Sequence, residues 1–335
     1  MRHFLFLVTI LLITGTVVNA QLRWEDTPQP KFFFEGNIYL GGVGGNLSAA
    51  DINSAYKSPV NTYASDIKYT DKFMFGVNLT AGYYFNKKRN LGIGTGITFL
   101  TQSSSMQMDT FHNEFMALDF ESHVFRQSVS SKSGIQESIT NTNISIPVFI
   151  RYKKPISENL TFTLDAGVLI GLLMQAKSTA SGSFDYEAIY KITNNGTANI
   201  YSYDNAPIPA STDILFTRAQ YALDNPTGGD VNAYFNSLQK VGYSVGLNNK
   251  VSKTSTINYK SMSIDASVQA SMHYYYNQHI TIKGGLYVLT ESFSNKSAAT
   301  TPFTTTPGSY NSFLQYTKTV LNYSYGLVLG VNYSM

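Results

Sequence analysis

The strand-like segments of this chain are separated by gaps that are alternately short and long. Eight segments of alternating polarity can be read between Phe32 and Met335. Turns of a few residues lie within 86–90, 153–159 and 277–279, whereas the connections near 42–71, 102–140, 177–259 and 294–319 are far longer. Short turns at one rim and long loops at the other are typical of a transmembrane β-barrel, whose short turns face the periplasm. The sequence therefore predicts an all-β fold: an eight-stranded antiparallel transmembrane β-barrel with short periplasmic turns and long, partly structured extracellular loops.

Each segment separates into an apolar and a polar face, because side chains alternate sides along a strand. In the fifth segment, for example, Phe162, Leu164, Ala166, Val168, Ile170 and Leu172 alternate with Thr161, Thr163, Asp165, Gly167 and Gly171. A soluble barrel of the lipocalin kind would turn the apolar face inward around a ligand cavity. The polar face is rich in Gly, Ser, Thr and Asn, and an eight-stranded barrel is just wide enough to be filled by its own side chains. We therefore expect the apolar face to point outward, into lipid.

Aromatic residues near the short turns share the parity of the apolar face. They are Phe34, Tyr83, Phe85, Tyr152, Tyr274, Tyr276 and Tyr333. Aromatic residues make up 14% of the chain and charged residues 13%, and this charge content is roughly half of that in a typical soluble domain. Tyr and Phe at the level of the lipid headgroups form the girdles of membrane barrels. The pattern predicts a periplasmic aromatic girdle.

The N-terminus has the three parts of a secretory signal. Arg2 supplies positive charge, residues 4–12 an apolar core, and Ala20 ends a small-residue cleavage site. We expect residues 1–20 to be a signal peptide, 21–31 a periplasmic N-terminal segment and 32–335 the barrel. No later segment offers the roughly 18 apolar residues of a transmembrane helix. The chain has no cysteine, which excludes a disulfide scaffold, and its net charge of +3 is too small to indicate a nucleic-acid partner.

The final strand carries a spaced pattern of Gly330, Tyr333 and Met335. This order of glycine, two spacers, hydrophobic residue, spacer and terminal hydrophobic residue resembles the assembly signal of small outer-membrane barrels. The chain resembles the OmpA/OmpX-like proteins, and more specifically Bacteroidetes-type outer-membrane β-barrel proteins. That family more often ends in Phe, and Leu329 stands where a polar residue is usual. The resemblance implies the outer membrane of a Gram-negative bacterium, contact with outer-membrane lipid, and recognition by the outer-membrane assembly machinery. It implies no catalytic residues.

Several charged residues fall on the predicted lumen face. They are Glu35, Arg151, Asp165, Asp265 and Lys283, accompanied by His273. Charges in a narrow interior must be paired and hydrogen-bonded. Arg151 and Asp165 flank the same short turn, and we expect them to pair and to be tied to Lys283 and Glu35. Two roles are open: a salt-bridged plug that closes the barrel, or a gate or proton path.

The histidines give little indication of catalysis or metal binding. The mature chain lacks the His-x-Ser pattern on a strand that marks lipid A deacylase barrels. His112 and His123 lie among Asp109, Glu114, Asp119 and Glu121 in the second long loop, but their spacing matches no ligand template. Nucleotide-binding fingerprints are also absent. We expect no enzyme activity, no cofactor and no metal.

The long loops contain structural signals of their own. In the third, 184–192 and 197–203 alternate around a turn at 194–196, Ser211 precedes a helical pattern through about Leu223, and Asp230 precedes a second. Tyr234, Phe235, Leu238 and Val241 would form an apolar stripe on the second helix. The second loop is also apolar, with Phe111, Phe115, Met116, Leu118 and Phe120. Such residues either pack over the barrel mouth or form a docking surface.

These features favour a non-enzymatic outer-membrane barrel whose extracellular loops bind or cover a partner at the cell surface. A porin-like narrow channel for ions or small solutes is one alternative, although eight strands scarcely leave a wet path. An accessory subunit of a larger transport or secretion complex is another, indicated by Gly36, Gly284, Thr95 and Thr290 at lipid-facing positions. A lipid-modifying enzyme is the least favoured.

Overall fold

The computed structural model describes residues 30–45, 63–64, 67–120, 122, 124–192, 212–259, 262–277, 279–295, 304, 306–316 and 319–335. The expected signal peptide, 1–20, and almost all of the expected periplasmic segment 21–31 lie outside these residues. Within the described part, the chain is β-structure apart from two α-helices and one 3-10 helix. None of the helices described is long and apolar enough to cross a membrane.

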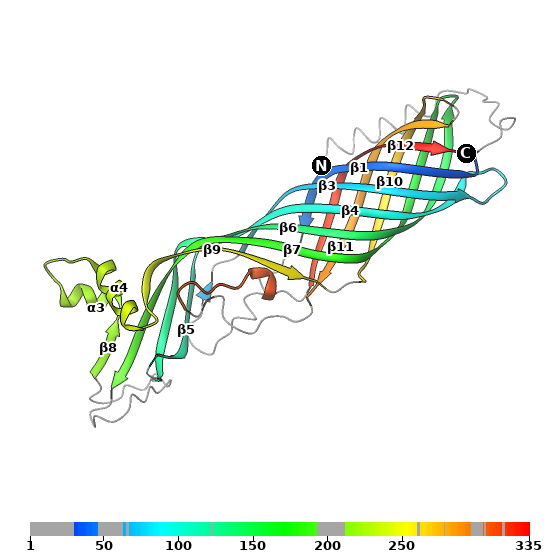
Figure 1. Ribbon diagram of the computed structural model, residues 1–335. Helices are drawn as coiled ribbons and strands as arrows, with labels where there is room; N and C mark the ends of the chain where they lie inside the picture. Colours follow the sequence, from blue (N-terminus) through cyan, green and yellow to red (C-terminus); the bar gives the residue numbers. More distant parts are fainter. Residues whose placement is uncertain are drawn as a thin grey trace.

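Twelve strands form one antiparallel sheet in the described part of the chain. They are β1 (Phe32–Gly45), β2 (Tyr63–Ala64), β3 (Ile67–Tyr84), β4 (Leu91–Met108), β5 (Phe111–Leu118), β6 (Val124–Ser157), β7 (Leu160–Ile192), β8 (Thr212–Phe216), β9 (Gly246–Asn258), β10 (Ile264–Tyr275), β11 (Ile280–Ser294) and β12 (Thr319–Ser334). The sheet closes on itself because β1 pairs with both β3 and β12. The closed ring runs β1–β3–β4–β6–β7–β10–β11–β12 (Figure 1).

The sequence interpretation expected eight strands joined by loops, and the twelve strands correct it. The four strands outside the ring, β2, β5, β8 and β9, come from stretches assigned to the first three long loops. The ring strands also continue into these stretches: β4 runs to Met108, β6 begins at Val124, and β7 runs to Ile192. The continuation has a physical reason, since β6 and β7 pair from Arg126 opposite Ile189 to Ser157 opposite Leu160. Each extended backbone thus satisfies the other's hydrogen bonds.

In the ring, the apolar face points outward and the polar face inward. Leu79 is 66% exposed, Ile150 58% and Val331 53%. Their strand neighbours of opposite parity, such as Thr80 and Arg151, are buried inside. The apolar faces of β4 and β7 run from Leu91 to Phe99 and from Phe162 to Leu172, close to the 9–11 residues that a tilted strand needs to cross a bilayer.

The polarity of the two faces reverses where β6 and β7 leave the ring. The register of this pair shifts at Ile144, and Leu172 and Leu173 of β7 are both exposed. Beyond this bulge, the outward residues of β7 are Gln175, Lys177, Thr179 and Ser181, whereas the inward residues Met174, Ala176 and Ala180 are buried. The outer surface of the sheet is therefore apolar around the ring and polar around the extension, by which we mean the part of β4, β6 and β7 beyond the bulge together with β9.

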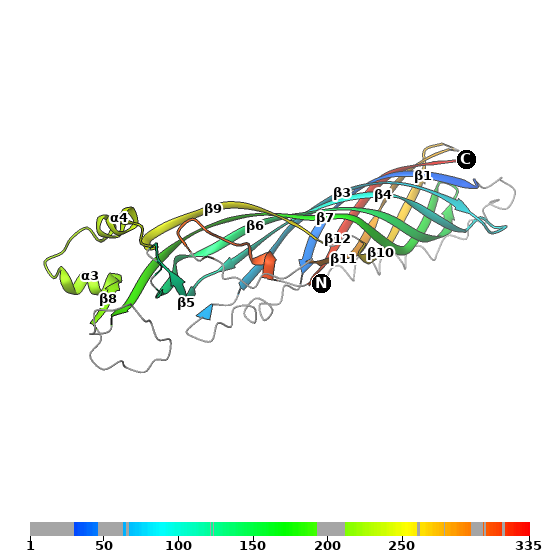
Figure 2. The same ribbon diagram turned by 60° about the horizontal axis from the view of Figure 1, so that its bottom comes forward.

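The extension is a curved sheet whose concave face is filled by the segment 306–316. This segment carries the 3-10 helix η1 (Phe313–Tyr316). Tyr310, Phe313, Leu314 and Tyr316 pack with apolar residues of β4, β6, β7 and β9 in one buried cluster. Figures 1 and 2 show η1 beside the extension, between the ring and the far tip. The last long connection, near 294–319, is thus in part a packed core element.

The far tip combines β5, β8 and two helices, α3 (Arg218–Asp224) and α4 (Val231–Val241), as Figure 2 shows. The expected helix capped by Asp230 is confirmed: its carboxylate accepts from the amides of Asn232 and Ala233. The other expected helix start is wrong, because 212–216 form β8 and the N-cap is Thr217, not Ser211. Phe235 is fully buried with Phe125 and Tyr190, and Tyr234 and Leu238 pack partly against the same cluster. Val241, the last residue of the expected stripe, is exposed. Of the expected hairpin, 184–192 is the end of β7, where 188–192 pair with β8, whereas 197–203 lies outside the described residues.

Candidate functional site

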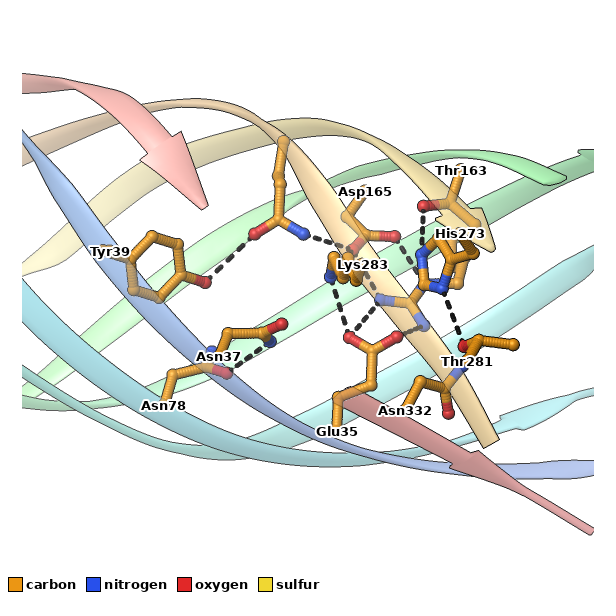
Figure 3. A network of polar contacts seen from close by, with 12 residues as sticks. Glu35, Asn37, Tyr39, Asn78, Thr163, Asp165, His273, Thr281, Lys283 and Asn332 are labelled. Atoms are coloured by element: carbon orange, nitrogen blue, oxygen red, sulfur yellow. Dashed lines mark hydrogen bonds and ion pairs between the residues drawn. The ribbon is translucent and has the colours of Figure 1, made fainter. Parts of the chain in front are cut away.

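Four charged side chains meet inside the ring, each from a different strand. Glu35 comes from β1, Arg151 from β6, Asp165 from β7 and Lys283 from β11. Strand alternation turns all four inward, and the pairing of β6 with β7 puts Arg151 directly opposite Asp165. Figure 3 shows Glu35, Asp165 and Lys283 pointing toward one another inside the ring. We call these four residues the lumen charge cluster.

Arg151 is held by both carboxylates. Its Nε donates to Asp165 Oδ1 and its Nη2 to Asp165 Oδ2, each over 2.6 Å. Toward Glu35, Nη2 donates to Oε2 over 2.8 Å, and Nη1 donates to Oε1. The guanidinium carbon also lies 4.2 Å from the centroid of the Phe33 ring. Two bidentate contacts and one aromatic face use the planar guanidinium fully, which a lysine ammonium could not do.

Lys283 completes the charge balance of the cluster. Its Nζ donates to Glu35 Oε2 over 2.9 Å and lies 3.9 Å from Asp165 Oδ2. The Arg151 and Lys283 side chains are fully buried, and the Glu35 side chain is 1% exposed. Two cations thus face two carboxylates, so the cluster is neutral. Neutrality and close geometry are what a buried ion pair needs to offset the loss of hydration.

Neutral side chains continue the network away from the charges. Gln269 Nε2 donates to Asp165 Oδ2 over 3.3 Å, and the Tyr39 hydroxyl donates to Gln269 Oε1 over 3.1 Å. On the other side of the bore, Asn37 Nδ2 donates to Asn78 Oδ1 over 2.9 Å (Figure 3). Sequence reasoning missed Tyr39 and Gln269. Both residues have the parity of the lumen face, but sequence reasoning looked only for charged residues and histidine on that face.

His273 is hydrogen-bonded between two strands near the same level. Its Nε2 lies 3.0 Å from Thr163 Oγ1 and its Nδ1 lies 3.4 Å from Thr281 Oγ1. Closer to the short turns, the Lys153 ammonium lies 5.3 Å from the centroid of the Tyr84 ring. Both residues are buried, so polar packing extends from the cluster to the rim of the ring.

A second, apolar layer fills the lumen on the side of the extension. It consists of the buried side chains of Tyr39, Val43, Met74, Leu100, Leu169, Tyr287, Leu289 and Val328. The cavity between this layer and the charge cluster is about 30 Å³. Such a space holds water but is far below the roughly 300 Å³ of a small-molecule pocket. In the described residues, the bore is filled by side chains.

Asp265, also expected in the lumen network, does not join the cluster. Its Oδ2 accepts from Ser263 Oγ over 2.8 Å, and its Oδ1 accepts from the Ser292 amide over 2.6 Å. It sits at the start of β10, near the end where the extension begins. Asp265 therefore fixes β10 against β11 instead of neutralising Arg151 or Lys283.

A second buried carboxylate, Glu137 on β6, anchors the segment 306–316 inside the extension. Its Oε1 accepts from the Tyr310 hydroxyl over 2.5 Å and from the Phe313 amide over 2.8 Å. Its Oε2 accepts from Ser178 Oγ over 2.5 Å and from Ser312 Oγ over 2.7 Å. Burial raises the pKa of the Glu137 carboxyl, although these donors oppose the shift. Sequence reasoning missed this site, because Tyr310, Ser312 and Phe313 lie more than 170 residues along the chain from Glu137.

The rim residues expected from sequence lie on the outer surface at the short-turn end. Every side chain expected in the aromatic girdle is exposed: Phe34, Tyr83, Phe85, Tyr152, Tyr274, Tyr276 and Tyr333. Gly330 lies on β12 opposite Asn37, whose side chain fills the space that a Cβ at residue 330 would need. Met335 follows the last residue of β12, and its amide donates to the Phe32 carbonyl over 3.1 Å.

The acidic and histidine-rich stretch considered as a metal site is partly described. His112 Nε2 lies 3.6 Å from Glu114 Oε1, and the other Glu114 oxygen lies 3.7 Å from Arg126 Nη1. His123 and Glu121 lie outside the described residues. Among the residues that the structure describes, no group of three or more His, Cys, Asp or Glu side chains is arranged to hold a metal ion.

Comparison with known proteins gives distant likenesses in fold. A scan against models of protein families and a search of curated proteins both find no match. Among solved structures, the translocator domain of the autotransporter NalP from Neisseria meningitidis matches with 9% identity and a TM-score of 0.21, covering 98% of this chain and 96% of that one. The outer membrane protease OmpT from Escherichia coli matches with 8% identity and a TM-score of 0.24, covering 93% of this chain and all of that one. At these scores, neither likeness indicates a shared activity.

Proposed function

We propose that this chain is an eight-stranded transmembrane β-barrel of the outer membrane, with a sealed lumen, that presents its extension and tip to a partner at the cell surface. The observation that carries the proposal is the reversal of face polarity along β7. Leu164, Val168 and Leu172 point outward in the ring, and Lys177 and Thr179 point outward in the extension. A soluble protein has no reason to change the polarity of its outer face at one level, whereas a membrane boundary requires it.

The sealed lumen argues for a structural use of the charge cluster. A channel needs a continuous wet path, but charges, amides and an apolar layer follow one another across this bore. The cluster is neutral and makes direct contacts between β1, β6, β7 and β11. We infer a plug that closes the barrel and fixes its strand register. The channel alternative is therefore the less favoured, and we assign no catalytic role to any residue.

The tip is the part of the molecule best placed to reach a partner. β7 continues for 20 residues, from Leu173 to Ile192, which corresponds to roughly 65 Å of strand. Leu118 at the end of β5 is 66% exposed, Phe120 just after it is 52% exposed, and Val241 at the end of α4 is 63% exposed. Phe120 packs edge-on against Tyr243, with ring centroids 5.4 Å apart. Large exposed apolar side chains on a folded surface favour binding of another protein.

The proposal is tested by capture from detergent-solubilised outer membrane of the source cells. The comparison is between the full chain and a variant in which residues 187–245 are replaced by Asn-Gly, which joins the paired residues Tyr186 and Gly246 through a hairpin turn. A partner captured by the full chain and lost by the variant is the expected result. Equal capture by both, or ion conductance of the full chain in planar bilayers, would overturn the proposal.

A further inference from the structure

The outer face of the extension carries an ordered array of hydroxyl and amide side chains. Its members are Thr101, Ser103, Ser105 and Gln107 on β4, Thr142, Thr140, Ser138 and Gln136 on β6, Gln175, Lys177, Thr179 and Ser181 on β7, and Asn258, Thr256, Thr254 and Ser252 on β9. The pairing register aligns them in four rows across the four strands. The first residue given for each strand belongs to the first row, the second to the second row, and so on. We call this array the hydroxyl face.

The hydroxyl face has the composition of a saccharide-binding surface more than that of a solvated one. Solvated protein surfaces ordinarily carry roughly a quarter to a third charged residues. Lys177 is the one charged residue among the members named above; the ion pair of Lys68 and Asp109 borders the array beside Gln107. Its other members have hydroxyl or amide groups, and all but Ser105 are exposed or half-buried. Each such group both donates and accepts hydrogen bonds, as the hydroxyls of a sugar do.

A groove crosses the end of this face. It has a volume of about 470 Å³ and is lined by Gln107, Gln136, Ser181, Lys250 and Ser252, among others. Lys250 is exposed and adds a second positive charge at the groove. A groove of this size with hydroxyls, amides and an ammonium matches a sugar that carries phosphate or carboxylate groups.

The position of the hydroxyl face indicates which sugar it meets. Gln175 follows the exposed apolar pair Leu172 and Leu173 on the same strand. From Gln175 to Ser181, the face covers roughly 20 Å of strand, directly above the apolar band. In an outer membrane, this is the layer of the oligosaccharides linked to the outer-leaflet lipid.

We propose that the hydroxyl face binds the phosphorylated oligosaccharide of the glycolipid in which the barrel sits. This inference rests on the proposed membrane location and is independent of the partner at the tip. The hydroxyls of Thr179 and Thr254 hydrogen-bond to each other across β7 and β9, with their oxygens 3.2 Å apart, and a hydroxyl oxygen has two acceptor sites, so the pair can still accept from a sugar hydroxyl. Binding would fix the tilt of the extension relative to the membrane, and so the direction in which the tip points.

The test is a titration of the full chain, folded in detergent micelles, with the soluble core oligosaccharide released from lipopolysaccharide. Binding is followed by saturation-transfer NMR. The informative variant is Thr140→Val, Thr179→Val and Thr254→Val together, which removes three hydroxyls but keeps the branched β-carbon that strands favour. Thr95→Val is the matched control, because Thr95 is exposed on the outer face of the ring, where detergent covers it. Lys177→Gln is compared with Lys240→Gln on α4.

We expect saturable binding of the oligosaccharide to the native chain, and an affinity about tenfold lower for the triple variant. Lys177→Gln should also lower the affinity and should make binding less dependent on salt. Thr95→Val and Lys240→Gln should bind as the native chain does. Equal binding by the triple variant, or an absence of saturable binding, would overturn the proposal. So would full competition by inorganic phosphate, which would indicate an adventitious ion only. Gel mobility before and after heating, measured on the same samples, separates this failure from failure of the barrel to fold.

Discussion

Removing Arg151 and Asp165 together should destabilise the barrel by less than the sum of the two single changes. Arg151→Met leaves Glu35 and Asp165 facing Lys283 alone, so the cluster gains one uncompensated negative charge. Asp165→Asn leaves one uncompensated positive charge. The double variant is neutral again, with Lys283 still 2.9 Å from Glu35.

The magnitude follows from burial and distance. Breaking a buried ion pair by removing one partner costs about 3–5 kcal/mol, and unit charges about 4 Å apart at an effective dielectric constant of about 20 interact by about 4 kcal/mol. We therefore expect each single change to cost about 3–5 kcal/mol, and the double change to cost about 2–4 kcal/mol less than their sum. The assay is urea unfolding in lipid vesicles, read from the gel mobility of unheated samples. Thr163→Ser, a conservative change in the lumen, should be nearly neutral. Additive losses would show that the two groups do not interact and would refute the plug.

Three further predictions concern the outer face and the Glu137 anchor. Val168→Arg puts a cation into the apolar band and should lower the free energy of unfolding by about 2–4 kcal/mol. Thr179→Arg, on the same face of β7 but above the bulge, should change it by less than about 0.5 kcal/mol in the same urea assay. Equal costs for the two variants would contradict the membrane boundary. Glu137→Ala should lower the free energy of local opening of 306–316 by about 1–3 kcal/mol, seen as faster amide exchange there and not in β12. Because burial raises the pKa of Glu137 in the folded state, its contribution to docking should be complete below the ordinary carboxyl pKa and weaken as the pH rises through the raised value. Proteolysis of this segment should therefore increase as the pH rises above the ordinary carboxyl range in the native chain, and stay constant in Glu137→Gln.

Strand alternation was sufficient to place the lumen charges from sequence. A period of two residues puts Arg151 and Asp165 on one face whatever their partners are, and the short turn between them limits how far apart they lie. The helix capped by Asp230 was also predictable, because the capping residue and the apolar stripe agree. Ser211 and Thr217 have equivalent capping groups, so local sequence could not choose between them. Tertiary pairing decided, since 212–216 add to β7 as a strand.

The extension escaped sequence analysis for a different reason. Its strands alternate in polarity with inside and outside reversed, and much of the apolar material that fills its concave face comes from distant residues such as Tyr310 and Phe313. Glu137 lies opposite Met106 and Ala180, but its hydrogen bonds to Tyr310, Ser312 and Phe313 span more than 170 residues. No local pattern encodes such contacts.

The polarity reversal on β7 can be measured residue by residue. The chain contains no cysteine, so single cysteines at Leu164, Val168, Leu172, Lys177, Thr179 and Ser181 give one labelling site each. The protein is inserted into lipid vesicles and treated with a membrane-impermeant maleimide. We predict protection at residues 164, 168 and 172 and rapid labelling at residues 177, 179 and 181, with the change at the bulge beside Leu173. Uniform labelling of all six positions would contradict a barrel that spans the membrane and carries its extension outside it.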